Sequence, residues 1–517
     1  MTHEQIKHLL PSASSRVNDA WRCRVKASLF SEVVGRLVKE GGLPLSLLYA
    51  TDDRETNKSF GIHAVFPLDE EAQWVALSTS VSEKRPTYPA VTRSVMAAHW
   101  YERYLQDMFG IVPEGHPDPR RLVHHENIPK GTHPLRKDFE WNAKLEHAQV
   151  PYPMHNVEGD GIYEIPVGPI HAGIIEPGHF RFNVAGERII TLEGKLFFTH
   201  KGVEKLLEGK TPLEALPFIE RLSGDMAASH ALAFCQAVEK ISKTAVPPRA
   251  RAIRTALCEL ERITMHIHDL GNIAGMGTGY TLMAANGFRI KERLMRLSQA
   301  LLGNRFWRGV VVPGGVSRDW TSREGDLVKT TAAEAVKEMQ NLVNMALHSD
   351  GLRERLETTG VLTRETAAAY GAVGLPARAS GVARDVRSHH PYAAYAELPW
   401  EIVTMEEGDV YARYLCRAKE LEISLSVLLA ALDLYTGEPV AERVSLKDGW
   451  DVSAVESWRG EILTAVHLKD GKIERCSPRD PSFCNWPLFG EIGPGNIVPD
   501  FPLCNKSLNL SYSGTDM

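Results

Sequence analysis

Long helical patterns dominate the second half of the chain and restrict its fold more than any other feature. Ile253, Leu257, Leu260, Ile263, Ile267 and Leu270 follow one another at steps of four and three residues, and Gly271 is the predicted end of that helix. The same spacing recurs in residues 290–301 before Gly303, in residues 332–346 and in residues 411–428. Each such helix has one apolar stripe that it must bury against a neighbour. The sequence therefore predicts a helical bundle core.

A different pattern fills the N-terminal part. Residues 28–40 have helical apolar spacing that ends at Gly41-Gly42, and residues 43–50, 60–66 and 73–79 have the composition and alternation of strands. A polar stretch over residues 140–160 separates this unit from residues 164–208, which alternate as a small antiparallel sheet and end in a helix over 200–208. Strand-like alternation returns over residues 456–487. The predicted fold is α+β, with an α/β domain over residues 1–150 and a mainly helical domain with small antiparallel sheets over residues 151–517.

Charge and cysteine content narrow the partners and the compartment. The formal net charge of -6 provides no broad basic field, so we expect no nucleic-acid partner. The seven cysteines include no Cys-x-x-Cys pair, which argues against an iron-sulfur or zinc site built by this chain alone and favours buried, reduced thiols in the cytoplasm. The N-terminus lacks the apolar core of a signal peptide, and no apolar run approaches the roughly 20 residues of a spanning helix. Any membrane association is expected to come through a partner.

The run IERLSGDMAASHALAFCQAVEK over residues 219–240 resembles the signature of the nickel-iron hydrogenase large subunit. In that signature an Arg precedes two cysteines, a His and a helix ending in Val-Glu, and here these are Arg221, His230 and Val238-Glu239. Ser223 and Met226 stand at the two cysteine positions. A second cysteine pair of the family, in Asp-Pro-Cys-x-x-Cys, corresponds to Ser482 and Asn485, with Cys484 between them. Nickel requires soft thiolate ligands, so the resemblance implies a family member that holds no nickel-iron centre.

Other motifs resemble respiratory complex I. Residues 99–139, with WYER, DMFGI, EGHPDPRR and HPLRKD in order, resemble the end of its C-type subunit, and residues from 164 onwards resemble its D-type subunit and the hydrogenase large subunit alike. This C/D fusion, with EPGHFRF and HKGVEK, is most similar to the group 4 hydrogenases of the formate hydrogenlyase and hydrogenase-4 type. The Arg120-Arg121 pair is expected to dock on neighbouring carboxylates, and the alternative is a solvated basic loop.

The resemblance also implies site residues. Glu176, in a Glu-Pro-Gly-His turn, matches a Glu that begins the proton route of hydrogenases, and we expect it to relay protons together with His179. Arg459 matches an Arg that overhangs the hydrogenase cavity. Of the complex I quinone residues, the His corresponds to Pro177, the Tyr to Phe198, two residues before His200, and the Asp to Ser223, with Asp225 two residues on. Seven further charged residues on the same helices form either a buried polar core or solvated helix faces: Arg221, His230, Glu239, Arg254, Glu259, Arg262 and His266.

The leading hypothesis is a nickel-free large-subunit relative in a complex I-related oxidoreductase, which couples electron transfer to proton or ion translocation. It implies no cofactor on this chain, iron-sulfur clusters in a small subunit like the B-type subunit of complex I, antiporter-like membrane subunits, and a peripheral position on the cytoplasmic side of the membrane. The family implies NADH- or formate-linked reduction of quinone or protons. One alternative is a quinone-reducing NADH dehydrogenase-type subunit with an altered quinone site, which requires an apolar tunnel near Phe198 and Ser223. The other is a scaffold without chemistry.

Overall fold

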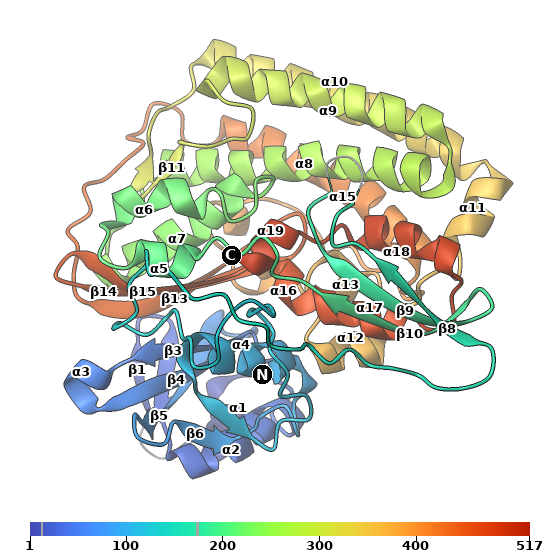
Figure 1. Cartoon of the computed structure of the whole chain (residues 1–517). Helices are drawn as coiled ribbons and strands as arrows, with labels where there is room; N and C mark the ends of the chain where they lie inside the picture. Colours follow the sequence, from blue (N-terminus) through green and yellow to red (C-terminus); the bar gives the residue numbers. More distant parts are fainter. Residues whose placement is uncertain (12–13, 172–174) are drawn as a thin grey trace.

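The computed structural model describes residues 1–11, 14–171 and 175–517. It confirms the predicted α+β architecture (Figure 1). An N-terminal sheet with its helices lies at one end, a bundle of long helices at the other, and a three-stranded sheet formed by β13, β14 and β15 between them. Residues 172–174, inside the predicted sheet pattern of residues 164–208, lie outside the described part of the chain.

The N-terminal sheet has five strands in the order β1-β2-β5-β4-β3. β3 (Leu47–Asp52), β4 (Ser59–Leu68) and β5 (Gln73–Ser82) pair antiparallel, and β2 (Ala20–Arg24) pairs with β5 in parallel. α2 (Ala27–Lys39) buries Phe30, Val34 and Leu37 against this unit, and α4 (His99–Phe109) packs on β3. The predicted helix and three strands are therefore present, each within a few residues of its expected bounds.

The bundle is built around α8 (Pro248–Thr278), which contacts α9 (Thr281–Leu302), α15 (Val410–Asp433), α10 (Ser322–Leu347) and α7 (Ala227–Ser242). Gly303 ends α9 in a left-handed conformation, as predicted. Gly271 does not end α8, so that prediction is wrong. A Cβ at Gly271 would lie 2.9 Å from the Gly287 Cα, and the two glycines instead allow α8 and α9 to approach backbone to backbone.

The two smaller sheets position the rest of the molecule. β8 (Ile162–Val167), β9 (His179–Ala185) and β10 (Arg188–Lys195) form an antiparallel sheet in the order β10-β9-β8. β13 (Gly449–Glu456), β14 (Glu461–Lys469) and β15 (Lys472–Arg479) form another, buried along almost its whole length. α7 packs against β13 and β14, and Arg475 on β15 donates from Nε to the Ala50 carbonyl of β3 at 3.1 Å. This sheet thus joins the bundle to the N-terminal unit (Figure 1).

Shorter elements complete the chain. They are α1 (His3–Ile6), β1 (Ser14–Val17), α3 (Arg54–Asn57), β6 (Thr87–Pro89), β7 (Val112–Glu114), α5 (Val203–Leu207), α6 (Pro212–Ile219), β11 (Val311–Val312), β12 (Gly315–Val316), α11 (Asp350–Leu356), α12 (Arg364–Tyr370), α13 (Leu375–Arg378), α14 (Val386–His389), α16 (Pro481–Asn485), α17 (Phe489–Ile492), α18 (Phe501–Leu508) and α19 (Tyr512–Asp516). Residues 115–161, all of which the structure describes, form no helix or strand. The predicted boundary near residue 150 falls in this stretch.

Candidate functional site

Three of the predicted site residues meet beneath the N-terminal end of α7. Ser223 and Asp225 lie in the turn between α6 and α7, and Arg459 lies in the turn between β13 and β14. The Arg459 guanidinium forks onto Asp225, with Nη1–Oδ1 at 2.7 Å and Nη2–Oδ2 at 2.8 Å, and the Ser223 hydroxyl donates to Asp225 Oδ1 at 2.8 Å. Burial raises the pKa of the Asp225 carboxyl, but the charge of Arg459 outweighs it and brings the pKa to about 2. The pair is therefore an ionised, bidentate ion pair.

Two glycines place the turn that carries Arg459. A Cβ at Gly374 would lie 2.0 Å from the Arg459 carbonyl oxygen and 2.4 Å from the Gly460 Cα. Gly374 also has a φ of +69°, in the left-handed region that favours glycine. The loop before α13 therefore presses directly on the β13–β14 turn and holds Arg459 over Asp225.

The four positions that correspond to the family's thiolates hold buried side chains that the protein itself satisfies. The Ser223 and Ser511 hydroxyl oxygens lie 3.0 Å apart, and the Ser511 amide donates to the Ser482 hydroxyl at 2.9 Å. The Asn485 carboxamide exchanges two hydrogen bonds with the Val373 backbone, at 3.0 and 3.1 Å. Met226 is fully buried in a cluster with Met265 and Trp458.

These residues do not fit a nickel-iron centre. Hydroxyl and carboxamide groups are neutral oxygen or nitrogen ligands, and a thioether, although soft, carries no charge, so none of them replaces a thiolate. The neighbouring Cys484 faces away from them, since its Sγ contacts Arg479 Nη1 at 3.1 Å and the Tyr101 hydroxyl at 3.4 Å. Within the described part of the chain, no three His, Cys, Asp or Glu side chains are grouped so that they could hold a metal ion. All seven cysteines are buried free thiols, as expected.

A second buried pair, His230 and Asp480, lies beside these positions. His230 Nε2 and Asp480 Oδ2 are 3.0 Å apart and both side chains are 1% exposed. Burial raises the pKa of Asp480, but the hydrogen bond from His230 leaves it below its ordinary value. Asp480 also caps α16 by accepting from the Ser482 amide at 2.8 Å. The pair thus ties α7 to the helix that carries Ser482 and Asn485.

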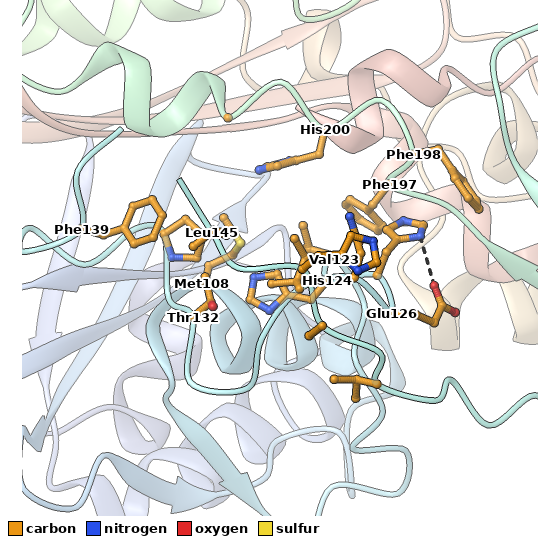
Figure 2. A pocket seen from close by; sticks show the side chains of 18 of the residues that line it. Met108, Val123, His124, Glu126, Thr132, Phe139, Leu145, Phe197, Phe198 and His200 are labelled. Carbon is orange, nitrogen blue, oxygen red and sulfur yellow. Dashed lines mark ion pairs between the residues drawn. The ribbon is translucent and has the colours of Figure 1, made fainter. Parts of the chain in front are cut away.

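The remaining cofactor-binding candidates, Phe198 and His200, line a separate apolar cavity of about 1130 Å³ between the segment after β7 and the segment after β10 (Figure 2). His200 Nδ1 lies 2.6 Å from the Asp516 carbonyl, and because a carbonyl only accepts, His200 Nε2 is left as an acceptor. Across the cavity, the buried Nε2 of His124 has no hydrogen-bond partner among the described residues. Ser223 and Asp225 do not line this cavity. The predicted cofactor residues therefore fall in two places.

Glu176 and His179 are not joined to each other. Glu176 is exposed and accepts a hydrogen bond from the Ser513 amide at 3.0 Å, whereas His179 Nδ1 lies 3.3 Å from the Gly168 carbonyl. The proton-relay role of Glu176 stays a prediction. It was based on a buried Glu176 carboxylate in contact with the His179 imidazole, and the structure shows neither feature.

The docking role expected for Arg120 and Arg121 stays a prediction, and the structure shows both side chains bound to groups of this chain. Arg120 binds Asp118 at 2.7 Å and Glu193 at 2.5 Å, and Arg121 donates to the Ile128 carbonyl at 2.7 Å. Both guanidinium groups therefore serve this chain's own fold. The local sequence could not show this, because Glu193 lies 73 residues away from Arg120.

The charged helix residues form a buried polar core rather than solvated faces. Arg254, Glu259, Arg262 and His266 are at most 2% exposed, and Arg221 is the exposed exception. Arg254 pairs with Glu239, and His266 Nε2 lies 2.9 Å from Glu420.

The centre of this core was not predicted. Arg378 lies between Glu420 at 2.7 Å and Glu456 at 2.6 Å, with no exposed surface. Asp385 and Arg387 pair beside it at 2.8 Å. The signal was an Arg-rich loop, RASGVARDVR, set among small residues.

Comparison with known proteins identifies the family. Residues 23–145 match the 30 Kd subunit of respiratory-chain NADH dehydrogenase, residues 277–448 match its 49 Kd subunit, and residues 201–271 match the nickel-dependent hydrogenases. The chain is 32% identical to formate hydrogenlyase subunit 5 of Escherichia coli, over 97% of this chain and 90% of that one. It is 33% identical to hydrogenase-4 component G of the same organism, over 95% and 87%. The chain belongs to the family of nickel-iron hydrogenase large subunits and complex I C/D subunits.

Family membership sets the context of the site. A third relative, the membrane-bound hydrogenase subunit alpha of Pyrococcus furiosus, is 32% identical over 68% of this chain and 87% of that one. The relatives are named as subunits or components of larger assemblies, so partner subunits are implied for this member as well. In residues 1–11, 14–171 and 175–517 there is no helix long and apolar enough to cross a membrane.

Proposed function

We propose that this family member is a large subunit that works without a nickel centre inside a complex I-related membrane assembly. The observation that carries the proposal is the state of the four thiolate positions. Ser223, Ser482 and Asn485 are neutral and hydrogen-bonded to the protein, and Met226 is packed in an apolar cluster. Binding nickel there would require breaking these contacts without supplying any thiolate charge.

The polar framework around those positions supports a role beyond a scaffold. The Arg459–Asp225 pair and the His230–Asp480 pair place four ionisable groups around the thiolate positions. Buried charges are expensive unless paired, and replacing such pairs by apolar side chains is often neutral or stabilising. Their presence is therefore better explained by a charge-dependent function, in which redox changes in a partner's iron-sulfur clusters are coupled to proton or ion movement in membrane subunits.

Nickel depletion tests this proposal. The intact complex is purified from membranes of cells grown with nickel and of cells grown with a nickel chelator, and its redox activity is measured with artificial electron donors and acceptors. Equal yield and equal activity are expected. A nickel hydrogenase assayed from the same cultures serves as the control and loses activity in the depleted cells. Loss of this complex's activity on depletion, restored by added nickel, contradicts the proposal.

A quinone-reducing role is the second candidate, and the cavity in Figure 2 favours it. Its volume of about 1130 Å³ and its aromatic lining suit an apolar ring, and His200 Nε2 could accept a hydrogen bond from a reduced, hydroxyl-bearing ring. The cavity does not extend to Ser223. Narrowing it by Leu145→Trp should abolish saturable binding of a short-chain quinone analogue if this role is correct. Unchanged binding in that variant removes the second candidate.

A further inference from the structure

A cationic hollow lies at the end of α6 and shares no lining residue with the apolar cavity. It has a volume of about 450 Å³ and is lined by the end of α6 and by the loop that follows α9. Three guanidinium groups line it, from Arg221, Arg308 and Arg318. Figure 1 shows α6 beside β11, which the same loop leads into.

Two of the three arginines keep unused donors. Arg318 is engaged, because it donates to the Leu301 carbonyl at 2.6 Å and pairs with Glu324. Arg221 is exposed and makes one hydrogen bond, from Nη1 to the Pro217 carbonyl at 2.6 Å. Arg308 Nε is shielded from solvent and, among the described residues, has no hydrogen-bond partner. A buried donor without a protein acceptor is unfavourable, so the Arg308 guanidinium can take a ligand oxygen as its hydrogen-bond partner.

The charges around the hollow do not balance. Glu220 is the one carboxylate among its described lining residues, and its Oε1 already accepts from the Gly309 amide at 2.6 Å. Burial and then repulsion by Arg221 lower the pKa of Arg308, with Glu220 opposing. Burial also disfavours the charged form of Glu220 and therefore raises the pKa of its carboxyl. Two neighbouring cations thus share a single, occupied carboxylate.

We infer that this hollow binds the phosphate group of a small organic phosphate ester through Arg221 and Arg308. Guanidinium forks match phosphate oxygens in geometry and charge. The hollow is larger than a bare phosphate needs and falls within the size range of small-molecule sites. Leu301, Leu302 and Val310 line the remainder and would contact the organic part.

The site adjoins the central motif. A Cβ at Gly224 would lie 3.6 Å from Arg308 Nη2, and Gly224 stands between Ser223 and Asp225. An ester bound to Arg308 therefore lies beside the turn that carries Asp225, which makes it a ligand able to influence the Arg459–Asp225 pair.

Calorimetry of the full chain with phenyl phosphate tests the inference. Saturable binding of phenyl phosphate is expected, weakened about tenfold or more by Arg308→Gln and by Arg221→Gln, since a hydrogen bond to a charged group contributes about 1.5–3 kcal/mol. The control is Arg296→Gln, an exposed arginine elsewhere on α9 whose side chain is 77% exposed, and it should leave binding unchanged. Absence of saturable binding, or equal weakening by Arg296→Gln, overturns the inference.

The source of the phosphate is distinguished by a second arm. Flotation with phosphatidylglycerol vesicles is compared with flotation with phosphatidylcholine vesicles for the wild type and Arg308→Gln. Phenyl phosphate binding without vesicle binding supports a free phosphate ester. Arg308-dependent binding to the anionic vesicles in addition supports a lipid headgroup at the same site. If Arg308→Gln leaves vesicle binding unchanged and the protein does not bind phenyl phosphate, the result counts against the site.

Discussion

The Arg459–Asp225 ion pair makes the sharpest quantitative prediction. Its two hydrogen bonds of 2.7 and 2.8 Å bring the charge centres to about 4 Å, where two unit charges attract by about 4 kcal/mol at an effective dielectric constant of 20. Arg459 is 5% exposed and Asp225 is 29% exposed, so solvent reduces this and we expect a coupling of about 2–3 kcal/mol. Asp225→Asn and Arg459→Met should each destabilise by about 3 kcal/mol, because each leaves a charge without its partner. The double variant should lose about 3–4 kcal/mol instead of about 6.

Urea unfolding of the full chain, followed by circular dichroism, measures this cycle. The exposed pair of Arg353 and Glu357, 2.8 Å apart on one helix turn, is the matched control and should show a coupling of about 0.3–0.5 kcal/mol. Because the folded-state pKa of Asp225 lies below its unfolded value of 3.8, the pair's contribution is present above that pH and is lost as the pH falls towards 2. Asp225→Asn should flatten the acid side of the stability curve. A coupling no larger than that of the control pair, with an unchanged acid slope, refutes the reasoning.

Three further predictions concern the core. Burial raises the pKa of Glu261 to about 8, so the unfolded chain releases this proton at lower pH than the folded chain. The free energy of unfolding should therefore fall as pH rises from about 5 to 8, by at most about 1.4 kcal/mol per pH unit. Glu261→Gln should remove that slope when urea unfolding is measured as a function of pH. Arg378→Met removes the cation that Glu420 and Glu456 share and should destabilise by about 3–5 kcal/mol in the same assay. A loss below about 1 kcal/mol would show that these carboxyls are neutral. Gly271→Ala should destabilise by about 1–3 kcal/mol because its Cβ would press on the backbone of α9. The control is Gly325→Ala on α10, which has open space around it and should be neutral or stabilising. Equal effects of the two variants would contradict the close α8–α9 contact.

The parts of the fold that follow a regular period were predictable. The apolar stripe of Ile253 to Leu270 predicts α8 because a 3.6-residue period is a local property of the chain. Gly271 was misassigned because a glycine ends a helix and admits a neighbouring backbone for the same reason, the absence of a side chain. Only the position of Gly287 on α9 decides between the two.

The candidate site was predictable in its residues and less so in its arrangement. Motif positions indicated Ser223, Asp225 and Arg459, and the structure brings all three together. Pairings between distant residues were out of reach, such as Arg378 with Glu420, 42 residues apart. Charge alone does not show whether an arginine faces solvent or a buried carboxylate. The separation of Phe198 and His200 from Ser223 likewise depends on how the segment after β7 folds over them.

The metal content of the intact complex tests the central claim most directly. The complex is purified from membranes of cells grown with ample nickel, and nickel and iron are measured by mass spectrometry relative to the amount of this chain. The hydroxyl, thioether and carboxamide side chains at the four thiolate positions predict iron from a partner's clusters and less than about 0.1 nickel per chain. About one nickel per chain, retained through purification, would contradict the account.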